Sequence, residues 1–190
     1  MHSLREDIEE LNQKVLLLAV DPDDAELCVR YLGASQTVVE RLRRATAGGC
    51  RCAISCGVPL VTLQSQVASD LAAPSGVEVS SRKFREKIPE AMVEINLLSL
   101  NLARRIALIN PQIACLLFGL NRGEMEVVVA ACMRDIRVYA GRSAAVVMLR
   151  GASAPVLWER MMIGGRIDGP RGRRLSHDAA LQSLQAMAGG

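Results

Sequence analysis

Three cysteines lie close together in the first half of the chain, at Cys50, Cys52 and Cys56. Thiolates at short spacing are typical of zinc sites, but a structural zinc ion takes four protein ligands. The two histidines, His2 and His177, are distant in sequence, and no paired C-x-x-C spacing is present. We therefore expect no metal here. The cysteines would instead be small apolar residues of a strand, or one of them would cross-link subunits.

The sequence lacks the motifs that mark common enzyme classes. It contains no nucleophile elbow, Walker loop, H-E-x-x-H motif or dinucleotide fingerprint. With two histidines in the whole chain, general acid–base catalysis has few candidate residues. The glycines of GGRIDGPRGRR do not follow a strand and open a helix with phosphate-binding spacing. We expect a protein that is not an enzyme and that needs no cofactor.

Arginines are the remaining residues whose pattern suggests binding chemistry. Those of interest lie on a predicted short helix and in the flexible, basic stretch GGRIDGPRGRR: Arg134, Arg137, Arg171, Arg173 and Arg174. Ser176 is predicted to cap a last helix, over residues 177–188, beside that stretch. Arginines so placed can neutralise phosphates, and we interpret this set as candidate phosphate contacts; the family resemblance given below implies that they are DNA-binding residues. The alternative is a loop that is only solvated.

Composition and charge favour a helical protein whose second half faces any polyanion. Of the 190 residues, 50% are hydrophobic and only 3% are aromatic, a mixture that favours helices over a sandwich or barrel. Residues 1–75 carry 7 basic and 10 acidic side chains, whereas residues 76–190 carry 16 and 10. The charged start and the short apolar run VLLLAV predict no signal peptide. We expect a cytoplasmic protein with reduced thiols and no membrane association.

Caps and breakers divide the first half into three predicted helices, over residues 1–20, 25–32 and 36–45. Ser3 and Glu6 form a capping box, Gly33 closes the second helix, and Ser35 caps the third. The stretch YLGASQTVVERLRR is therefore similar to the second half of a helix-turn-helix, with a glycine in the turn. CRCAISC and LVTLQ then predict two short strands.

The stretch Ile88–Leu120 is the most strongly helical part of the chain. Residues 92–109 contain no internal glycine or proline, and apolar residues fill most faces of the predicted helix. A helix that is apolar on most sides is buried on most sides. We therefore expect it to pack against its own subunit and also against another chain or repeat, through Leu97, Leu100 and Ile106.

The second half repeats the plan of the first. Aligning Gly33 with Gly119 needs an offset of 86 residues, and aligning Pro59 with Pro155 needs 96. This difference predicts about ten extra residues and an additional helix in the second copy. VLW after Pro155 would be the counterpart of LVT after Pro59. The predicted organisation is a first repeat at 1–71, a linker at 72–88, and a second repeat with a basic loop and C-terminal helix at 89–190.

The stretch EINLLSLNLARRIALINPQIACLLFGLN resembles the FlhD family of flagellar transcriptional regulators of proteobacteria. The family pattern N-L-x-x-L-x-L-A-x-R is met by Asn96, Leu97, Leu100, Leu102, Ala103 and Arg105, and the family's Gly-apolar-Asn sequence by Gly119, Leu120 and Asn121. The closing SHDAALQSL, which begins at Ser176, is similar to the family's C-terminal region, which is implicated in DNA binding. The resemblance covers roughly residues 90–190, with a degenerate version over residues 5–65.

The resemblance implies a mainly α fold with short strands, in which two FlhD-like repeats interlock as two chains do in the family's dimer. It also implies a transcriptional regulator subunit that acts in an oligomeric complex on promoter DNA, controlling flagellar or related genes. An FlhC-like partner would supply zinc and much of the DNA contact, so no metal is needed in this chain. The alternative is a fused pair that binds such a partner and modulates it without touching DNA.

Overall fold

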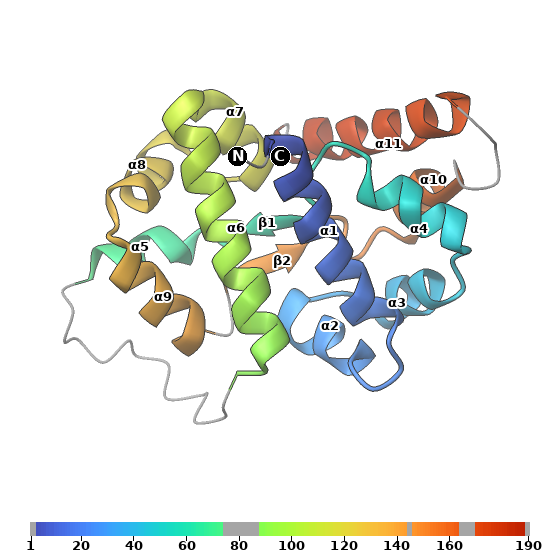
Figure 1. Cartoon of the computed structure of the whole chain (residues 1–190), viewed down its shortest axis with the longest axis horizontal. Helices are drawn as coiled ribbons and strands as arrows, with labels where there is room; N and C mark the ends of the chain where they lie inside the picture. The colour runs from blue at the N-terminus through green and yellow to red at the C-terminus, as the bar shows by residue number, and fades with distance from the viewer. Residues whose placement is uncertain (1–2, 74–87, 144–145, 164–169, 189–190) are drawn as a thin grey trace. The chain divides into compact units, whose positions relative to one another are not determined.

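The computed structural model describes residues 3–73, 88–143, 146–163 and 170–188, and most of these residues are helical (Figure 1). This confirms the predicted mainly α fold with short strands. Within the described ranges, no helix is both long and apolar enough to cross a membrane. In chain order the elements are α1 (Leu4–Val20), α2 (Ala25–Leu32), α3 (Gln36–Arg43), α4 (Ala47–Ile54), β1 (Val61–Leu63), α5 (Gln66–Ala72), α6 (Glu90–Ile109), α7 (Pro111–Phe118), α8 (Arg122–Ala130), α9 (Met133–Arg142), β2 (Val147–Leu149), α10 (Pro155–Ile163) and α11 (Pro170–Ala188).

The order of elements from α1 to α5 recurs from α6 to α10. Corresponding landmarks run from position 33 to 119, from 46 to 132 and from 61 to 147, an offset of 86 residues each time. Gly33 and Gly119 end α2 and α7 with φ angles of 66° and 72°. Glycine adopts this left-handed conformation without a Cβ clash, so both helices end at the same kind of turn.

The stretch CRCAISC lies largely in helix α4, so the predicted strand there is wrong. Thr46 caps α4, because its Oγ1 accepts a hydrogen bond from Gly49 N at 3.1 Å. The first repeat therefore already contains the helix that corresponds to α9, and the second has no ten-residue insertion at this point. VLW lies in α10, so the counterpart of β1 (VTL) is instead β2 (VML).

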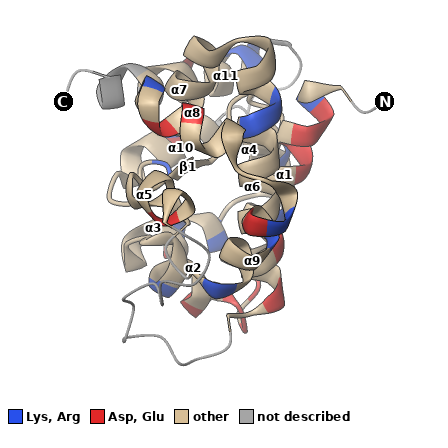
Figure 2. Cartoon of the chain, turned by 90° about the vertical axis from the view of Figure 1, so that its left-hand side faces the viewer, with Lys and Arg blue, Asp and Glu red and all other residues tan. Residues whose placement is uncertain are grey.

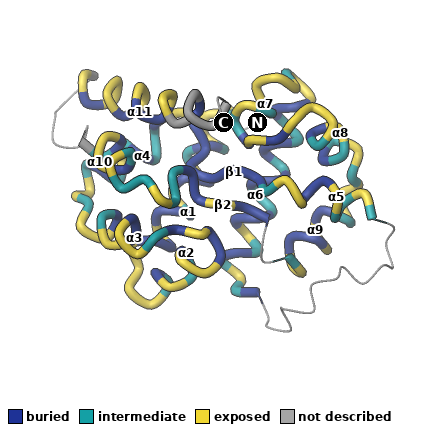
Figure 3. Tube along the Cα trace, turned by 180° about the vertical axis from the view of Figure 1, so that it is seen from behind, coloured by how far each residue is buried: buried dark blue, intermediate teal, exposed yellow. Residues whose placement is uncertain are grey.

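Strands β1 and β2 pair in a two-stranded sheet. Arg150 N donates to Leu60 O at 2.8 Å, and Gln64 N donates to Val146 O at 3.0 Å. Residue numbers therefore rise along one strand as they fall along the other, which makes the pair antiparallel. All of β1 is buried, whereas Met148 in the middle of β2 is exposed (Figure 3).

The helices pack into two compact units, residues 1–62 with 148–190 (unit 1) and residues 63–147 (unit 2). These boundaries differ from the predicted repeats, because the helix after each strand packs with helices of the other repeat. In unit 2, α5 contacts α8 and α9; in unit 1, α10 contacts α3 and α4. Most of the predicted linker lies outside the described residues.

Unit 1 has a core of large apolar side chains from both repeats. Leu11 of α1, Leu32 of α2 and Leu42 of α3 are fully buried, as is Trp158 of α10. The indole N–H of Trp158 donates to Gly151 O at 3.2 Å, so burial of the ring leaves no polar group unpaired. A Cβ at Gly49 would lie 3.1 Å from Met162 O, so glycine permits the close approach of α4 and α10.

Unit 2 is built around α6, which contacts α7, α8 and α9. Met92, Ile95 and Leu100 of α6 are fully buried, together with Phe118 of α7 and Ile136 of α9. The apolar spacing predicted for α6 therefore supplies a core inside the chain, in agreement with part of the expectation from the sequence.

The first helix of each repeat carries a buried asparagine, Asn12 in α1 and Asn96 in α6. Asn12 of α1 donates from Nδ2 to Ile54 O (3.1 Å) and Val58 O (2.9 Å), and its Oδ1 accepts from Leu60 N (2.8 Å). Asn96 of α6 donates to Ala140 O at 3.2 Å and to Ser143 O at 3.3 Å. Ile54 ends α4, and Ala140, 86 positions later, lies near the end of α9. Each asparagine therefore connects the first helix of its repeat to the end of the helix that precedes the strand.

A side-chain hydrogen bond links α5 to α9 within unit 2. The Tyr139 hydroxyl donates to Asp70 Oδ2 at 3.0 Å. Burial raises the pKa of Tyr139, and the charge of Asp70 raises it further, so the phenol stays protonated and acts as the donor.

We expect Tyr139→Phe to lower the free energy of unfolding by about 1 kcal/mol, because Asp70 is only half-buried and water can replace the phenol. Urea denaturation followed by circular dichroism measures this. Tyr31→Phe is the matched control, since the Tyr31 hydroxyl has no recorded partner in the described part of the chain. Equal losses in the two variants would show that the contact contributes nothing specific.

Candidate functional site

Three of the predicted DNA-binding arginines lie on one helix of unit 1. Helix α11 begins at Pro170, so Arg171, Arg173 and Arg174 are in its first turns and are exposed. The prediction of a flexible basic loop is therefore wrong from Pro170 onward. Proline is compatible with a first helical turn, which is the signal that locates this helix start. Residues 164–169 of the predicted loop lie outside the described residues.

Ser176 does not cap a helix, which corrects that prediction. It lies in the interior of α11 and is buried. Its hydroxyl donates to Met161 O, and Gly172 O in the preceding turn lies 3.3 Å from the same oxygen. A serine inside a helix can bond to a carbonyl one turn earlier or to a neighbouring helix. Ser176 therefore holds α11 against α10, and its side chain is not available at the surface.

The other two predicted arginines lie in unit 2. Arg134 and Arg137 are exposed on α9, one turn apart, and Arg142 at the end of the same helix is exposed as well. Within the described ranges, no salt bridge is recorded for these three side chains. The structure thus brings the predicted arginines together as two basic surfaces, one on α11 of unit 1 and one on α9 of unit 2.

The predicted helix-turn-helix has the expected local geometry. Gly33 lies between α2 and α3, and Ser35 caps α3 by accepting from Val38 N at 3.3 Å. Val38, Val39 and Leu42 are buried, which leaves a polar outer face on α3. The same arrangement recurs at α7 and α8, where Asn121 is the cap.

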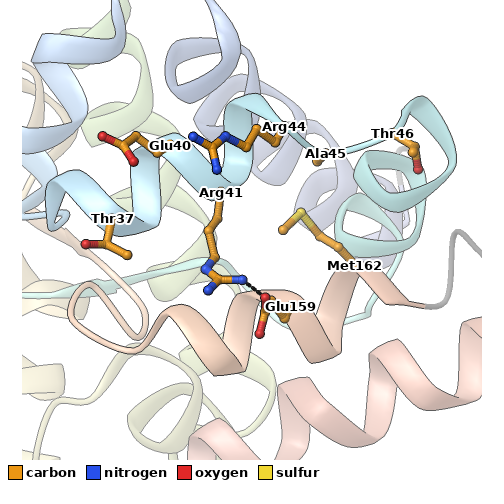
Figure 4. A pocket seen from close by; sticks show the side chains of 8 residues that line it. All are labelled: Thr37, Glu40, Arg41, Arg44, Ala45, Thr46, Glu159 and Met162. Carbon is orange, nitrogen blue, oxygen red and sulfur yellow. Dashed lines mark ion pairs between the residues drawn. The ribbon is translucent and has the colours of Figure 1, made fainter.

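A pocket that the sequence did not reveal lies in unit 1, between α3, the start of α4 and α10. It has a volume of about 450 Å³ (Figure 4). Arg41 of α3 forms an ion pair with Glu159 of α10 across it. Arg44, Glu40 and Met162 are further residues of its lining. Arg41 and Arg44 were visible in the sequence on one helix face, but Glu159 and Met162 come from the other repeat.

In the part of the chain that the structure describes, the three clustered cysteines are not gathered into a group that could hold a metal. Cys50 and Cys52 are half-buried on α4, and Cys56 is buried; all are free thiols. Burial raises the pKa of Cys56. His177 approaches only the backbone of this stretch, with Nδ1 2.7 Å from Cys56 O. Among the residues that the structure describes, no group of three or more His, Cys, Asp or Glu side chains is placed to hold a metal.

The residues predicted for an oligomer interface are mostly inside the chain. Leu100 and Ile106 are buried within the chain and Leu97 is half-buried, so neither of the first two is exposed to contact another chain. A different apolar surface is exposed at the α6–α7 corner, which we define as Leu108, Ile109, Ile113 and Leu116. Leu108 and Ile109, on α6, have exposed fractions of 69% and 68%, the highest among the large apolar side chains described.

One buried cation has no functional assignment from the sequence. Arg150, directly after β2, is 2% exposed, and its Nε donates to Pro59 O at 2.9 Å. Burial lowers the pKa of Arg150 to about 10, which leaves the side chain charged at neutral pH. Its position next to the strand pair gives it a structural role.

The described surface therefore offers three candidate binding features: exposed arginines on two helices, a charged pocket and an apolar corner. Comparison with known proteins adds no assignment: no family model matches the chain, and neither a curated protein nor a solved structure shows significant similarity to it.

Proposed function

We propose that this chain is a DNA-binding subunit of an oligomeric transcriptional regulator of the FlhD kind. The observation that carries the proposal is the cluster of Arg171, Arg173 and Arg174, exposed at the start of α11. In the described part of the chain, these side chains have no recorded salt bridge. Their donors are therefore available to phosphate oxygens, which planar guanidinium groups bind well.

The position of these arginines on the helix also supports an anionic partner. The start of a helix carries partial positive charge, which favours acidic side chains. Helix α1 follows this preference, with Glu6 and Asp7 in its first turn (Figure 2, red). Helix α11 has no acidic residue in its first turn and places Arg171 there. A bound phosphate would offset the resulting repulsion.

The resemblance to the FlhD family supports an FlhC-like protein as the partner. Arginines that contact phosphates position a protein on the duplex but read no bases. Sequence choice would therefore rest largely with the partner. Arg134 and Arg137 on α9 provide a second surface of the same chemistry.

Charge reversal on α11 tests the proposal. Arg173→Glu combined with Arg174→Glu is expected to weaken binding of the chain to duplex DNA at least tenfold at low salt. The slope of log K against log salt concentration should fall in magnitude by about two, because two phosphate contacts are lost. Fluorescence anisotropy at several salt concentrations measures both quantities.

A matched control keeps the change in net charge but moves it elsewhere. Arg5 and Arg51 are exposed, on α1 and α4, and Arg5→Glu combined with Arg51→Glu should leave the slope unchanged. If the α11 variant binds as tightly as the unaltered chain at every salt concentration, α11 does not contact DNA. Equal losses in both variants would show that only overall charge matters.

A second candidate function is an interaction protein that binds an FlhC-like or other partner without touching DNA. The α6–α7 corner favours it, because contiguous exposed apolar side chains mark many protein interfaces. Yellow segments at α7 in Figure 3 mark part of this exposed corner. Purification from the native host tests this candidate: Ile109→Glu should release the partner while the α11 variant retains it.

A further inference from the structure

The pocket between α3, the start of α4 and α10 has chemistry that the DNA-binding proposal does not use. Its charged lining consists of Arg41, Arg44, Glu40 and Glu159. Its volume of about 450 Å³ is in the range of small-molecule sites. All of these residues belong to unit 1, so the pocket is complete within that unit.

The second repeat shows that the fold does not need arginines at these positions. At the offset of 86 residues, Arg41 corresponds to Val127 and Arg44 to Ala130. Helices α8 and α9 form with these neutral residues just as α3 and α4 form with arginines. The two arginines therefore distinguish the first repeat from the second within a shared order of elements, which favours a role other than folding.

The charges of the lining define the kind of ligand. Arg41 is engaged by Glu159, but a guanidinium has five N–H donors and can bind a second anion. Arg44 has no recorded salt bridge in the described ranges. Because two carboxylates already balance two arginines, a ligand with one negative charge fits better than a polyanion.

An apolar wall completes the site. Met162 of α10 is half-buried and lines the same pocket as Arg41 (Figure 4). A flexible thioether adapts its shape to aliphatic groups. We propose that this pocket binds a small monocarboxylic acid, with the carboxylate held by Arg41 and Arg44 and the aliphatic part against Met162.

Hexanoate is a suitable probe, and the methyl group of Met162 is a suitable reporter. The full-length chain is labelled with ¹³C at its methionine methyl groups, and Met162→Leu assigns the resonance. Hexanoate at constant ionic strength should shift this resonance with saturation, with a dissociation constant on the order of 1 mM. Inorganic phosphate, titrated in the same way, should shift it much less.

Two variants replace an arginine of the pocket by the residue found at the corresponding position of the second repeat, where the same helices form. Arg44→Ala and Arg41→Val should each raise the dissociation constant for hexanoate about tenfold, through loss of a charge-assisted hydrogen bond. Arg43→Ala is the control, because Arg43 is exposed on the same helix but does not line the pocket. It should bind hexanoate as the unaltered chain does.

Three results would overturn the proposal: no saturable shift of the Met162 resonance with hexanoate, tighter binding of phosphate than of hexanoate, or unchanged hexanoate binding by Arg44→Ala. None of these outcomes depends on DNA. The binding of a carboxylate in unit 1 and the contact of α11 with DNA can therefore fail separately.

Discussion

Leu100→Asp is expected to lower the free energy of unfolding by about 4 kcal/mol or more. Leu100 is fully buried in α6, and an aspartate there would bring a carboxylate into an apolar core without a partner. Domains of this size are stable by only about 5–15 kcal/mol, so much of the chain should lose its helical circular dichroism at neutral pH. Urea denaturation of the partly folded protein measures the loss.

Leu97→Asp is the informative partner variant. Leu97 lies one turn earlier on α6 but is only half-buried, so a carboxylate there can keep part of its hydration. We expect a loss of about 1–2 kcal/mol. Light scattering separates folding from assembly: if Leu100→Asp stays fully folded and only the mass of the particle changes, Leu100 lies in an interface between chains instead of a core.

Asn12→Ala is the second change with a large expected effect, about 3 kcal/mol of unfolding free energy. The substitution removes the asparagine partner of two carbonyls, Ile54 O and Val58 O, and of the Leu60 amide, although Val58 O keeps the Cys56 thiol as a donor at 3.3 Å. Each buried group left without a hydrogen bond costs about 1–3 kcal/mol. Water entering the small cavity would recover part of that cost. Urea denaturation measures the difference.

The matched control is the same substitution in the second repeat. Asn96 donates to Ala140 O and Ser143 O, but its own Oδ1 is buried and has no partner among the described residues. Asn96→Ala removes that unsatisfied oxygen along with the two bonds, so we expect a smaller loss than for Asn12→Ala. The reverse order would contradict the hydrogen bonds that distinguish the two asparagines.

Much of the local structure could be predicted from the sequence, because local signals determine helix ends. Ser3 with Glu6 forms the predicted capping box, and Gly33 and Gly119 end their helices in the left-handed conformation. The strand predicted at LVTLQ is present as β1. These features depend on hydrogen bonds and backbone sterics within a few residues, which the sequence displays directly.

Prediction from local sequence was wrong where the same residue pattern is compatible with both a strand and a helix. CRCAISC is a short apolar run, and such a run fits either a buried strand or a buried helix. Thr46 decides in favour of the helix by capping it. Cys132 likewise caps α9, so α8 ends at Ala130 and a separate helix follows. The last helix starts six residues before the predicted cap at Ser176, since Pro170 is compatible with its first turn.

The candidate sites were predicted only in part. The exposed arginines Arg134, Arg137, Arg173 and Arg174 were identified from sequence, since charged side chains remain at the surface in most folds. The burial of Ser176 was not, because it depends on a carbonyl of α10. The charged pocket was also missed, since Arg41 and Glu159 are far apart in sequence.

Local signals in the sequence located many of the helices and several of their ends, but not α4, α5 or α10. How the elements are shared between the two compact units depends on tertiary packing. α5 joins α8 and α9, while α10 joins α3 and α4, so each compact unit takes a helix from the other repeat. The physical reason is that an apolar helix face can be buried against any matching surface, and periodicity does not specify which surface that is.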